Sequence, residues 1–126
     1  MWADKKQFVT IEQTTGAAGG AATITLAAVT GFRHAITNIF LMRGTGTAET
    51  PAGATVSVTT TNLPGSMAWT VGNNIPVGGT QTDVNLRFSP PLLASASGTS
   101  TTIVMGDPGT NPVWTGQVAY YLVAEL

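Results

Sequence analysis

Residues 82–88 read Thr82-Asp83-Val84-Asn85-Leu86-Arg87-Phe88, a strict alternation of two kinds of side chain. Side chains of a β-strand point alternately to opposite faces. The stretch therefore predicts a strand with Asp83, Asn85 and Arg87 in water and with Thr82, Val84, Leu86 and Phe88 on a core. The same alternation returns within residues 22–28, 54–58 and 118–124. One apolar and one polar face per strand is typical of antiparallel β-sheet, which we expect throughout the chain.

Turn signals divide the rest of the chain into short elements. Stretches rich in Gly, Pro or small residues lie at 16–20, 44–51, 72–79, 94–98 and 107–112, and they interrupt regular structure. Leu63-Pro64-Gly65-Ser66 suits a type II turn, and Pro90-Pro91 is expected to end the strand before it. The strands expected between these signals are 7–14, 22–28, 33–43, 54–61, 67–71, 82–88, 100–105 and 114–124.

Eight short strands separated by turns predict an all-β, two-sheet antiparallel β-sandwich, most simply a jelly roll. A chain of 126 residues fits one domain, expected over residues 8–126, after an N-terminal arm of residues 1–7.

Residues 33–43 leave two interpretations open. Ile36, Ile39, Phe40 and Arg43 have the i, i+3, i+4, i+7 spacing of a helix face. The β-branched residues and the lack of a good N-cap favour a strand instead. Because residues 36–42 are nearly all apolar, we expect a central strand that is covered on both faces.

The composition is unusual in its charge. Charged residues make up 9% of the chain and the net charge is −1, against about 25% charged residues in ordinary soluble domains.

The composition also argues against several classes of protein. Five basic residues cannot form the patch that nucleic acid requires, and no apolar run is long enough for a membrane helix. No apolar signal segment follows the first residues, and no cysteine is available for disulfides or thiolate metal sites. A neutral, hydroxyl-rich surface suits a protein that lies against other protein.

No catalytic group is predicted. His34, the only histidine, lies in an apolar strand, where a structural hydrogen-bonding role is favoured, and no nucleophile motif accompanies it. The carboxylates that a glycosidase would need, from Glu12, Glu49, Asp83 and Asp107, fall on different elements, and Asp83 is expected on a solvated face. We expect no enzyme and no cofactor.

One segment has the residue types of a metal site. Asp107, Thr110 and Asn111 could supply oxygen ligands for calcium. The favoured interpretation is a turn in which Asp107 and Asn111 bond their own backbone, so no metal is expected.

The aromatic residues admit two interpretations. Trp69 alternates with Met67 and Val71 and is expected in the core, although a sugar-stacking or subunit-contact surface of aromatic residues is the alternative. If the last strand is regular, one of Tyr120 and Tyr121 faces outward. Trp2, on the arm, either docks on a partner or folds back onto its own sheet.

Two segments resemble a known group of proteins. Gly31-Phe32-Arg33-His34-Ala35-Ile36-Thr37 and Phe88-Ser89-Pro90-Pro91-Leu92-Leu93-Ala94-Ser95-Ala96-Ser97-Gly98-Thr99 resemble stretches of small virion proteins of tailed phages. Together with the Thr-, Gly- and Ala-rich, cysteine-free composition, the resemblance extends over most of residues 8–125. It implies a jelly roll or similar sandwich that serves as a capsid decoration (cement) protein or another auxiliary head or tail component, commonly a trimer. It implies no catalytic residue.

The expected function is thus a phage virion structural protein, made in the host cytoplasm, that binds and stabilises an assembled protein shell. Its partners would be the major capsid protein or other virion subunits, with a homotrimer favoured. The alternative is a receptor- or carbohydrate-binding module of a fibre or spike. Contacts are expected on the arm and on two loops, at Trp2, Lys5, Lys6, Phe8, Thr47, Glu49, Asp107 and Asn111.

Overall fold

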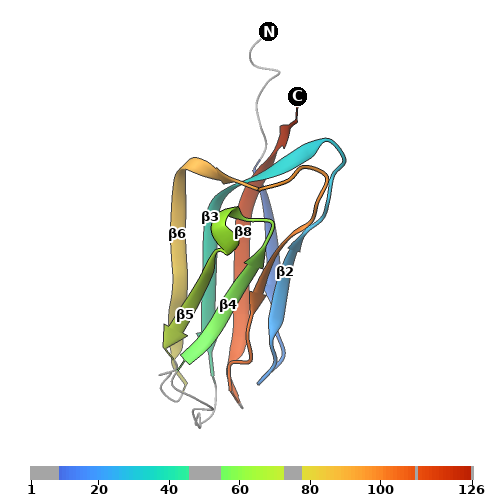
Figure 1. Ribbon diagram of the computed structural model, residues 1–126. Helices are drawn as coiled ribbons and strands as arrows, with labels where there is room; N and C mark the ends of the chain where they lie inside the picture. The colour runs from blue at the N-terminus through green and yellow to red at the C-terminus, as the bar shows by residue number, and fades with distance from the viewer. Residues whose placement is uncertain (1–8, 46–54, 73–77, 110, 126) are drawn as a thin grey trace.

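The alternating sequences form strands in two antiparallel four-stranded sheets that face each other (Figure 1). The computed structural model describes residues 9–45, 55–72, 78–109 and 111–125. The strands are β1 (Thr10–Thr15), β2 (Ala22–Leu26), β3 (Phe32–Gly44), β4 (Thr55–Thr61), β5 (Ala68–Gly72), β6 (Thr80–Leu93), β7 (Thr101–Met105) and β8 (Val113–Ala124). A short 3₁₀ segment, η2 (Pro64–Ser66), precedes β5.

The strand order is that of a jelly roll. One sheet has the order β1-β8-β3-β6 and the other β2-β7-β4-β5. The pairs β1–β8, β2–β7, β3–β6 and β4–β5 are all antiparallel. A chain that first pairs as one long hairpin and then rolls up gives this nested pairing. The all-β fold class, with eight strands in two sheets, is confirmed.

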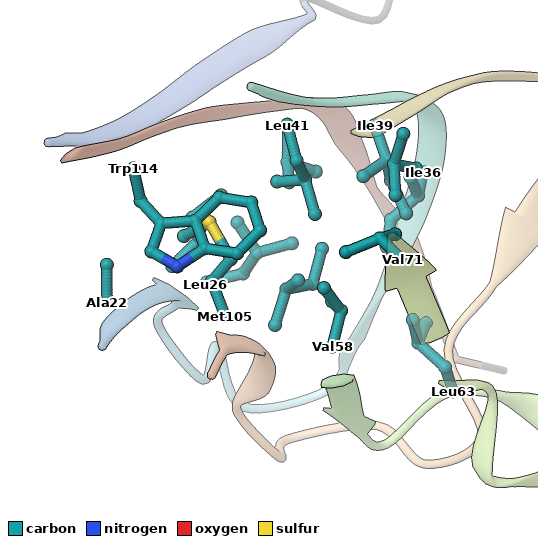
Figure 2. Close-up of a cluster of buried hydrophobic side chains, with 14 of the residues drawn as sticks. Ala22, Leu26, Ile36, Ile39, Leu41, Val58, Leu63, Val71, Met105 and Trp114 are labelled. Atoms are coloured by element: carbon teal, nitrogen blue, oxygen red, sulfur yellow. The ribbon is translucent and has the colours of Figure 1, made fainter. Parts of the chain in front are cut away.

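The inner faces of the two sheets meet in one apolar core (Figure 2). From the first sheet come Ile36, Ile39, Leu41, Trp114 and Val118, and from the second come Ile24, Leu26, Val58, Ile103 and Met105, all at most 1% exposed. The period-2 burial of β2, with Ala22, Ile24 and Leu26 inside, is the alternation that the sequence predicts. Trp69 and Met67 are partly buried and pack against this core.

Residues 33–43 form the long strand β3, so the helical alternative is wrong. The strand is central, between β8 and β6, but it is not covered on both faces. Asn38, Phe40 and Met42 are half-buried on the outer side, whereas the residues between them, Ile39 and Leu41, are fully buried. The outer apolar side chains of this strand are therefore accessible.

Strand β6 differs from expectation in length. It continues through Pro90 and Pro91 to Leu93, although these prolines were expected to end it. β6 lies at the edge of its sheet, where a strand has one side without hydrogen-bonding partners, so a residue without an N–H is tolerated.

A bulge in β6 reverses the predicted alternation. Leu41 pairs with Val84, but the next residue, Met42, pairs with Thr82, so Asp83 is an extra residue in β6. As a result Thr82 is exposed and the Asp83 side chain is 0% exposed. The expected positions of Thr82 in the core and Asp83 in water are both wrong, because an inserted residue shifts the parity of the strand on one side of it.

The segment 63–66 contains the short 3₁₀ element η2, and Gly65 within it has the non-helical backbone that the predicted type II turn requires at its third position. Gly65 has φ 69° and ψ 19°, a left-handed conformation that a glycine adopts without steric cost.

No helical segment of the described residues is long and apolar enough to cross a membrane.

Candidate functional site

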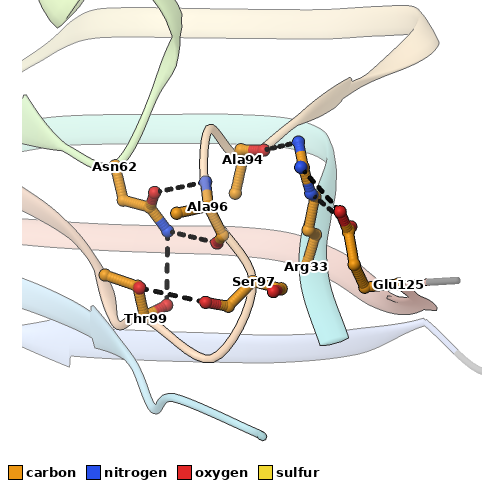
Figure 3. Close-up of polar contacts among 7 residues, drawn as sticks. All are labelled: Arg33, Asn62, Ala94, Ala96, Ser97, Thr99 and Glu125. Atoms are coloured by element: carbon orange, nitrogen blue, oxygen red, sulfur yellow. Dashed lines mark hydrogen bonds and ion pairs between the residues drawn. The ribbon is translucent and has the colours of Figure 1, made fainter. Parts of the chain in front are cut away.

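The two segments that carry the phage-protein resemblance lie against each other at one end of the sandwich (Figure 3). The Ala94 N–H donates to the His34 carbonyl at 2.8 Å, and the Gly98 N–H donates to the Phe32 carbonyl at 2.9 Å. The Arg33 guanidinium donates to the Ala94 carbonyl at 3.3 Å. The two segments, which are far apart in the sequence, therefore form one local structure.

Asn62 holds the loop of residues 94–100 in place (Figure 3). Its Oδ1 accepts a hydrogen bond from the Ala96 N–H at 2.8 Å, and its Nδ2 lies 3.2 Å from the carbonyl oxygens of Ala96 and Thr99. Its own carbonyl accepts from the Ser95 N–H. Asn62 has φ 61°, which Asn adopts more readily than most residues. The loop thus has a defined conformation.

An ion pair between Arg33 and Glu125 lies at the same end of the sandwich. Arg33 Nε lies 2.6 Å from Glu125 Oε2, and Nη2 lies 2.9 Å from Oε1. This hydrogen bond to the carboxylate raises the pKa of Arg33, against the opposing effect of desolvation. The two charges neutralise each other at the surface.

His34 is buried and both of its ring nitrogens are engaged. Nε2 lies 2.9 Å from the Ala27 carbonyl oxygen, and Nδ1 lies 2.8 Å from Thr101 Oγ1. Because a carbonyl only accepts, Nε2 donates to Ala27, and Nδ1 is paired with the Thr101 hydroxyl. Tyr120 packs edge-on against the ring. The structural hydrogen-bonding role is confirmed. The Thr101 hydroxyl and the His34 imidazole are not accessible to a substrate, because Thr101 is 0% and His34 2% exposed.

Asp83 forms a buried ion pair at the opposite end of the sandwich. Arg43 Nε and Nη2 lie 2.7 and 2.8 Å from the two carboxylate oxygens, and both side chains are 0% exposed. Gln81 Nε2 also donates to Asp83. The Arg43 guanidinium lies 4.9 Å from the centre of the Trp114 ring. The carboxylate is thus a structural partner of Arg43 and is not on a solvated face.

The sequence interpretation missed Arg43, although a signal was present. With Ile39 and Leu41 facing inward, the strand period places Arg43 on the inner face as well. A guanidinium at a core position requires a carboxylate nearby, and β6, the neighbour of β3, supplies it.

The outer face of the β1-β8-β3-β6 sheet is almost without charge. The strand pairings define three rows of side chains across it: Ile11, Ala119, Asn38 and Arg87; Gln13, Gln117, Phe40 and Asn85; and Thr15, Thr115, Met42 and Thr82. A hydrogen bond of 3.0 Å joins Gln13 and Gln117 within the second row. Arg87 is the single charged residue among the three rows.

A hollow opens in this face beside Arg87. It has a volume of about 390 Å³ and is lined by Thr37, Asn38, Arg87, Phe88 and Ser89. Arg87 is exposed, as its alternating strand predicts, but the hollow itself is not predictable from the local sequence, because it lies at a second irregularity of the β3–β6 pairing, between Ile36 and Asn38.

The predicted contact residues fall in different places. Asp107 is exposed and its Oδ1 accepts from the Gly109 N–H at 2.9 Å, which confirms the expected turn bonding for this residue. Asn111 is half-buried. Both lie between β7 and β8, at the end of the sandwich away from the start of β1. Within the described residues no three His, Cys, Asp or Glu side chains gather as for a metal. Six further residues lie outside the described residues: Trp2, Lys5, Lys6, Phe8, Thr47 and Glu49.

Comparison with known proteins gave no match to a family model and none to a curated protein. Among solved structures, the chain is similar to a chain of a virus-like particle of the extra small virus of the prawn Macrobrachium rosenbergii, with 12% identity and a TM-score of 0.36 over 90% of this chain and 79% of that one. A family 11 carbohydrate-binding module from Clostridium thermocellum, in complex with a β-1,3-1,4-mixed-linked tetrasaccharide, is similar at 9% identity and a TM-score of 0.31, over 96% of this chain and 89% of that one.

A family two carbohydrate esterase from Cellvibrio japonicus has 5% identity and a TM-score of 0.32, and the match covers 94% of this chain but only 36% of the esterase chain. At such low scores these similarities carry no inference about function.

Proposed function

We propose that this protein is a structural component of a phage virion, a capsid decoration protein that binds an assembled protein shell and stabilises it. The observation that carries the proposal is the nearly neutral exterior of the jelly roll. Of the charged residues in the described part of the chain, Arg33 pairs with Glu125 and Arg43 with Asp83. Only three others remain there: Glu12, Arg87 and Asp107.

A neutral surface favours close packing against other subunits. The buried centres of protein interfaces are depleted in charged residues, because a charge that loses its water must find a partner. Threonine, glutamine and alanine side chains, as on the outer face of the β1-β8-β3-β6 sheet, carry no such requirement. The exterior is therefore suited to contact with a protein lattice.

The resemblance to small tailed-phage virion proteins supports the same function. Its two segments form one hydrogen-bonded unit, held by Asn62 and by the ion pair of Arg33 with Glu125. On this proposal the partners are the major capsid protein or other virion subunits, the protein is a homo-oligomer with a trimer favoured, and its location is the virion. We also propose that it has no enzymatic activity, since the His34–Thr101 contact is buried.

Purified full-length protein and phage particles that lack it provide the test. We expect the protein to sediment with the particles at a saturating stoichiometry and to raise the temperature at which the heads release their DNA, because a protein that binds only the assembled shell stabilises it by mass action. A chain without residues 1–7 tests the arm, and loss of sedimentation is expected. Full-length protein that stays in the supernatant at every concentration contradicts the proposal.

A receptor- or carbohydrate-binding module is the second candidate. The observation that favours it is the hollow of about 390 Å³ beside Arg87, which lies in the volume range of small-molecule sites, roughly 300–1,000 Å³. Screening the protein against a glycan array tests this candidate, and the sedimentation assay tests shell binding independently.

A further inference from the structure

The hollow lies where the pairing of β3 and β6 is irregular, because β6 contains more residues than β3 between two paired positions. Ile36 pairs with Leu92 and Asn38 pairs with Arg87, so residues 88–91 of β6 lie opposite Thr37 alone. Bulges of this kind change the direction of side chains and are frequent beside binding sites. Here the irregularity leaves a space of about 390 Å³ against Thr37, Asn38, Arg87, Phe88 and Ser89.

The polar groups around the hollow are available for a ligand. In the described part of the chain, the Arg87 guanidinium has no carboxylate partner, whereas Arg33 and Arg43 each have one. Arg87 and Asn38 are paired across β6 and β3, so they project from the same face of the sheet. The Thr37 hydroxyl donates to the Ala119 carbonyl at 3.1 Å, which leaves its oxygen free to accept.

We propose that this hollow binds a sugar that carries a carboxylate, such as a uronic acid. The Arg87 guanidinium is a rigid fork of donors that matches a carboxylate. The Asn38 amide supplies both a donor and an acceptor, and the Ser89 hydroxyl does the same, which is what neighbouring sugar hydroxyls need. Phe88 also lines the hollow, and its side chain packs against the apolar core, so it supports the wall from the inner side.

A sugar fits this set of groups better than the acidic side chain of a protein does. A single carboxylate would occupy Arg87 and leave the Asn38 amide and the Ser89 hydroxyl without partners, at a cost if they were covered. The volume of the hollow also exceeds the need of one carboxylate and lies at the low end for small-ligand sites. The inference does not depend on shell binding.

The test uses the full-length protein and four probes: methyl β-D-glucuronide, methyl β-D-glucoside, acetate and an acidic peptide. Titrations followed by amide chemical shifts give the affinity and the location together. We expect the glucuronide to bind, with shifts concentrated at residues 37–38 and 87–89. Loss of a charge-assisted hydrogen bond weakens binding by roughly 10- to 100-fold, which is the deficit expected for the uncharged glucoside. Acetate should bind more weakly than the glucuronide.

Two matched pairs of variants locate the site. Arg87→Gln is expected to lose roughly 10- to 100-fold in affinity, whereas Arg87→Lys should lose less because the charge remains. Asn38→Ala should weaken binding, and Asn85→Ala, on the same face but outside the lining of the hollow, should leave it unchanged. Circular dichroism checks that each variant is folded.

The proposal is overturned by any of four results. These are absence of glucuronide binding, equal binding of the glucoside, equal binding of acetate, and tighter binding of an acidic peptide than of the glucuronide. Particle sedimentation of Arg87→Gln separates the two proposals, since failure of sugar binding leaves the proposed shell binding untouched.

Discussion

Arg43 and Asp83 form a fully buried ion pair inside an apolar sandwich. Arg43 reaches both carboxylate oxygens, and its Nη2 also donates to the Gly72 carbonyl at 2.6 Å. The Trp114 ring stacks against the guanidinium, and the Trp114 Nε1–H donates to the Gly106 carbonyl at 2.7 Å. Such a network gives little net stability against an apolar equivalent, but removal of one member leaves a buried charge uncompensated. Loss of either member is therefore expected to destabilise the fold.

Asp83→Asn is predicted to destabilise the protein strongly. The substitution keeps the shape of the side chain but leaves the Arg43 guanidinium without a counter-charge, which costs about 3–5 kcal/mol. Urea denaturation followed by tryptophan fluorescence measures the change in the free energy of unfolding. Thr82→Ala, at the exposed neighbouring position, is the control and should change stability by less than about 0.5 kcal/mol. Equal stability of the two variants would show that the pair is not buried.

The ion pair also marks where prediction from single residues fails. His34 was predicted correctly, because a buried imidazole needs hydrogen-bonding partners for its nitrogens, and Ala27 and Thr101 supply them. Asp83 was predicted wrongly, because its environment depends on one extra residue in the β3–β6 pairing. The local sequence around Asp83 contains no signal for a bulge. The signal lay on the partner strand, in the inward parity of Arg43.

At the scale of elements, the approach of β4 to the end of β7 depends on a glycine. The Gly106 N–H donates to the Ser57 carbonyl at 2.9 Å, and a Cβ at residue 106 would lie 2.7 Å from that same oxygen. Backbone cannot move aside as the end of a side chain can. The two strands are therefore this close only because residue 106 has no side chain.

Gly106→Ala is predicted to destabilise the protein by about 1–3 kcal/mol, because the added methyl group forces the backbone of β4 and β7 apart. The melting temperature measured by circular dichroism should fall accordingly. Gly72→Ala is the matched control, since a Cβ at residue 72 meets nothing within 4 Å. If both variants melt at the wild-type temperature, the close approach of the strands is wrong.

The loop of residues 94–100 is predicted to depend on one amide side chain. Asn62→Gly keeps the left-handed backbone accessible but removes the bond to the Ala96 N–H. Hydrogen exchange of the Ala96 amide should accelerate markedly, because a local opening then exposes it to solvent. The Ala94 amide, bonded to the His34 carbonyl, is the internal control and should stay protected. Unchanged exchange at Ala96 would contradict the proposed role of Asn62.

The strands themselves were largely predictable from alternation. Residues 22–26 and 55–61 alternate in burial as their sequences do, because one face of each lies on the core and the other in water. The extension of β6 through Pro90 and Pro91 was not predictable in this way. The extension is possible because β6 is an edge strand, and the local sequence does not determine the order of strands in a sheet.

At the scale of the whole molecule, the jelly roll places far-separated segments side by side. β1 pairs with β8 and β2 with β7, so the sheets are held by contacts between the two ends of the chain. Counting strands and turns gave the class of fold, since eight short strands have few compact arrangements. The hollow beside Arg87 could not be found in this way. It requires the register of β3 against β6, which only the folded chain supplies.

The neutral exterior of the whole molecule leads to a last prediction about salt. Interactions between exposed charges weaken as ionic strength rises, with a screening length of about 10 Å at 0.1 M salt and 3 Å at 1 M. A protein that binds its shell through hydroxyl, amide and small apolar side chains has little to lose by screening. Sedimentation with particles should therefore change by less than about threefold between 0.05 and 0.5 M NaCl, roughly 0.6 kcal/mol in binding free energy. Sugar binding at Arg87 should weaken over the same range, because it depends on one charge. A steep loss of shell binding with salt would mean that charged groups dominate the contact, contrary to the proposed use of the neutral surface.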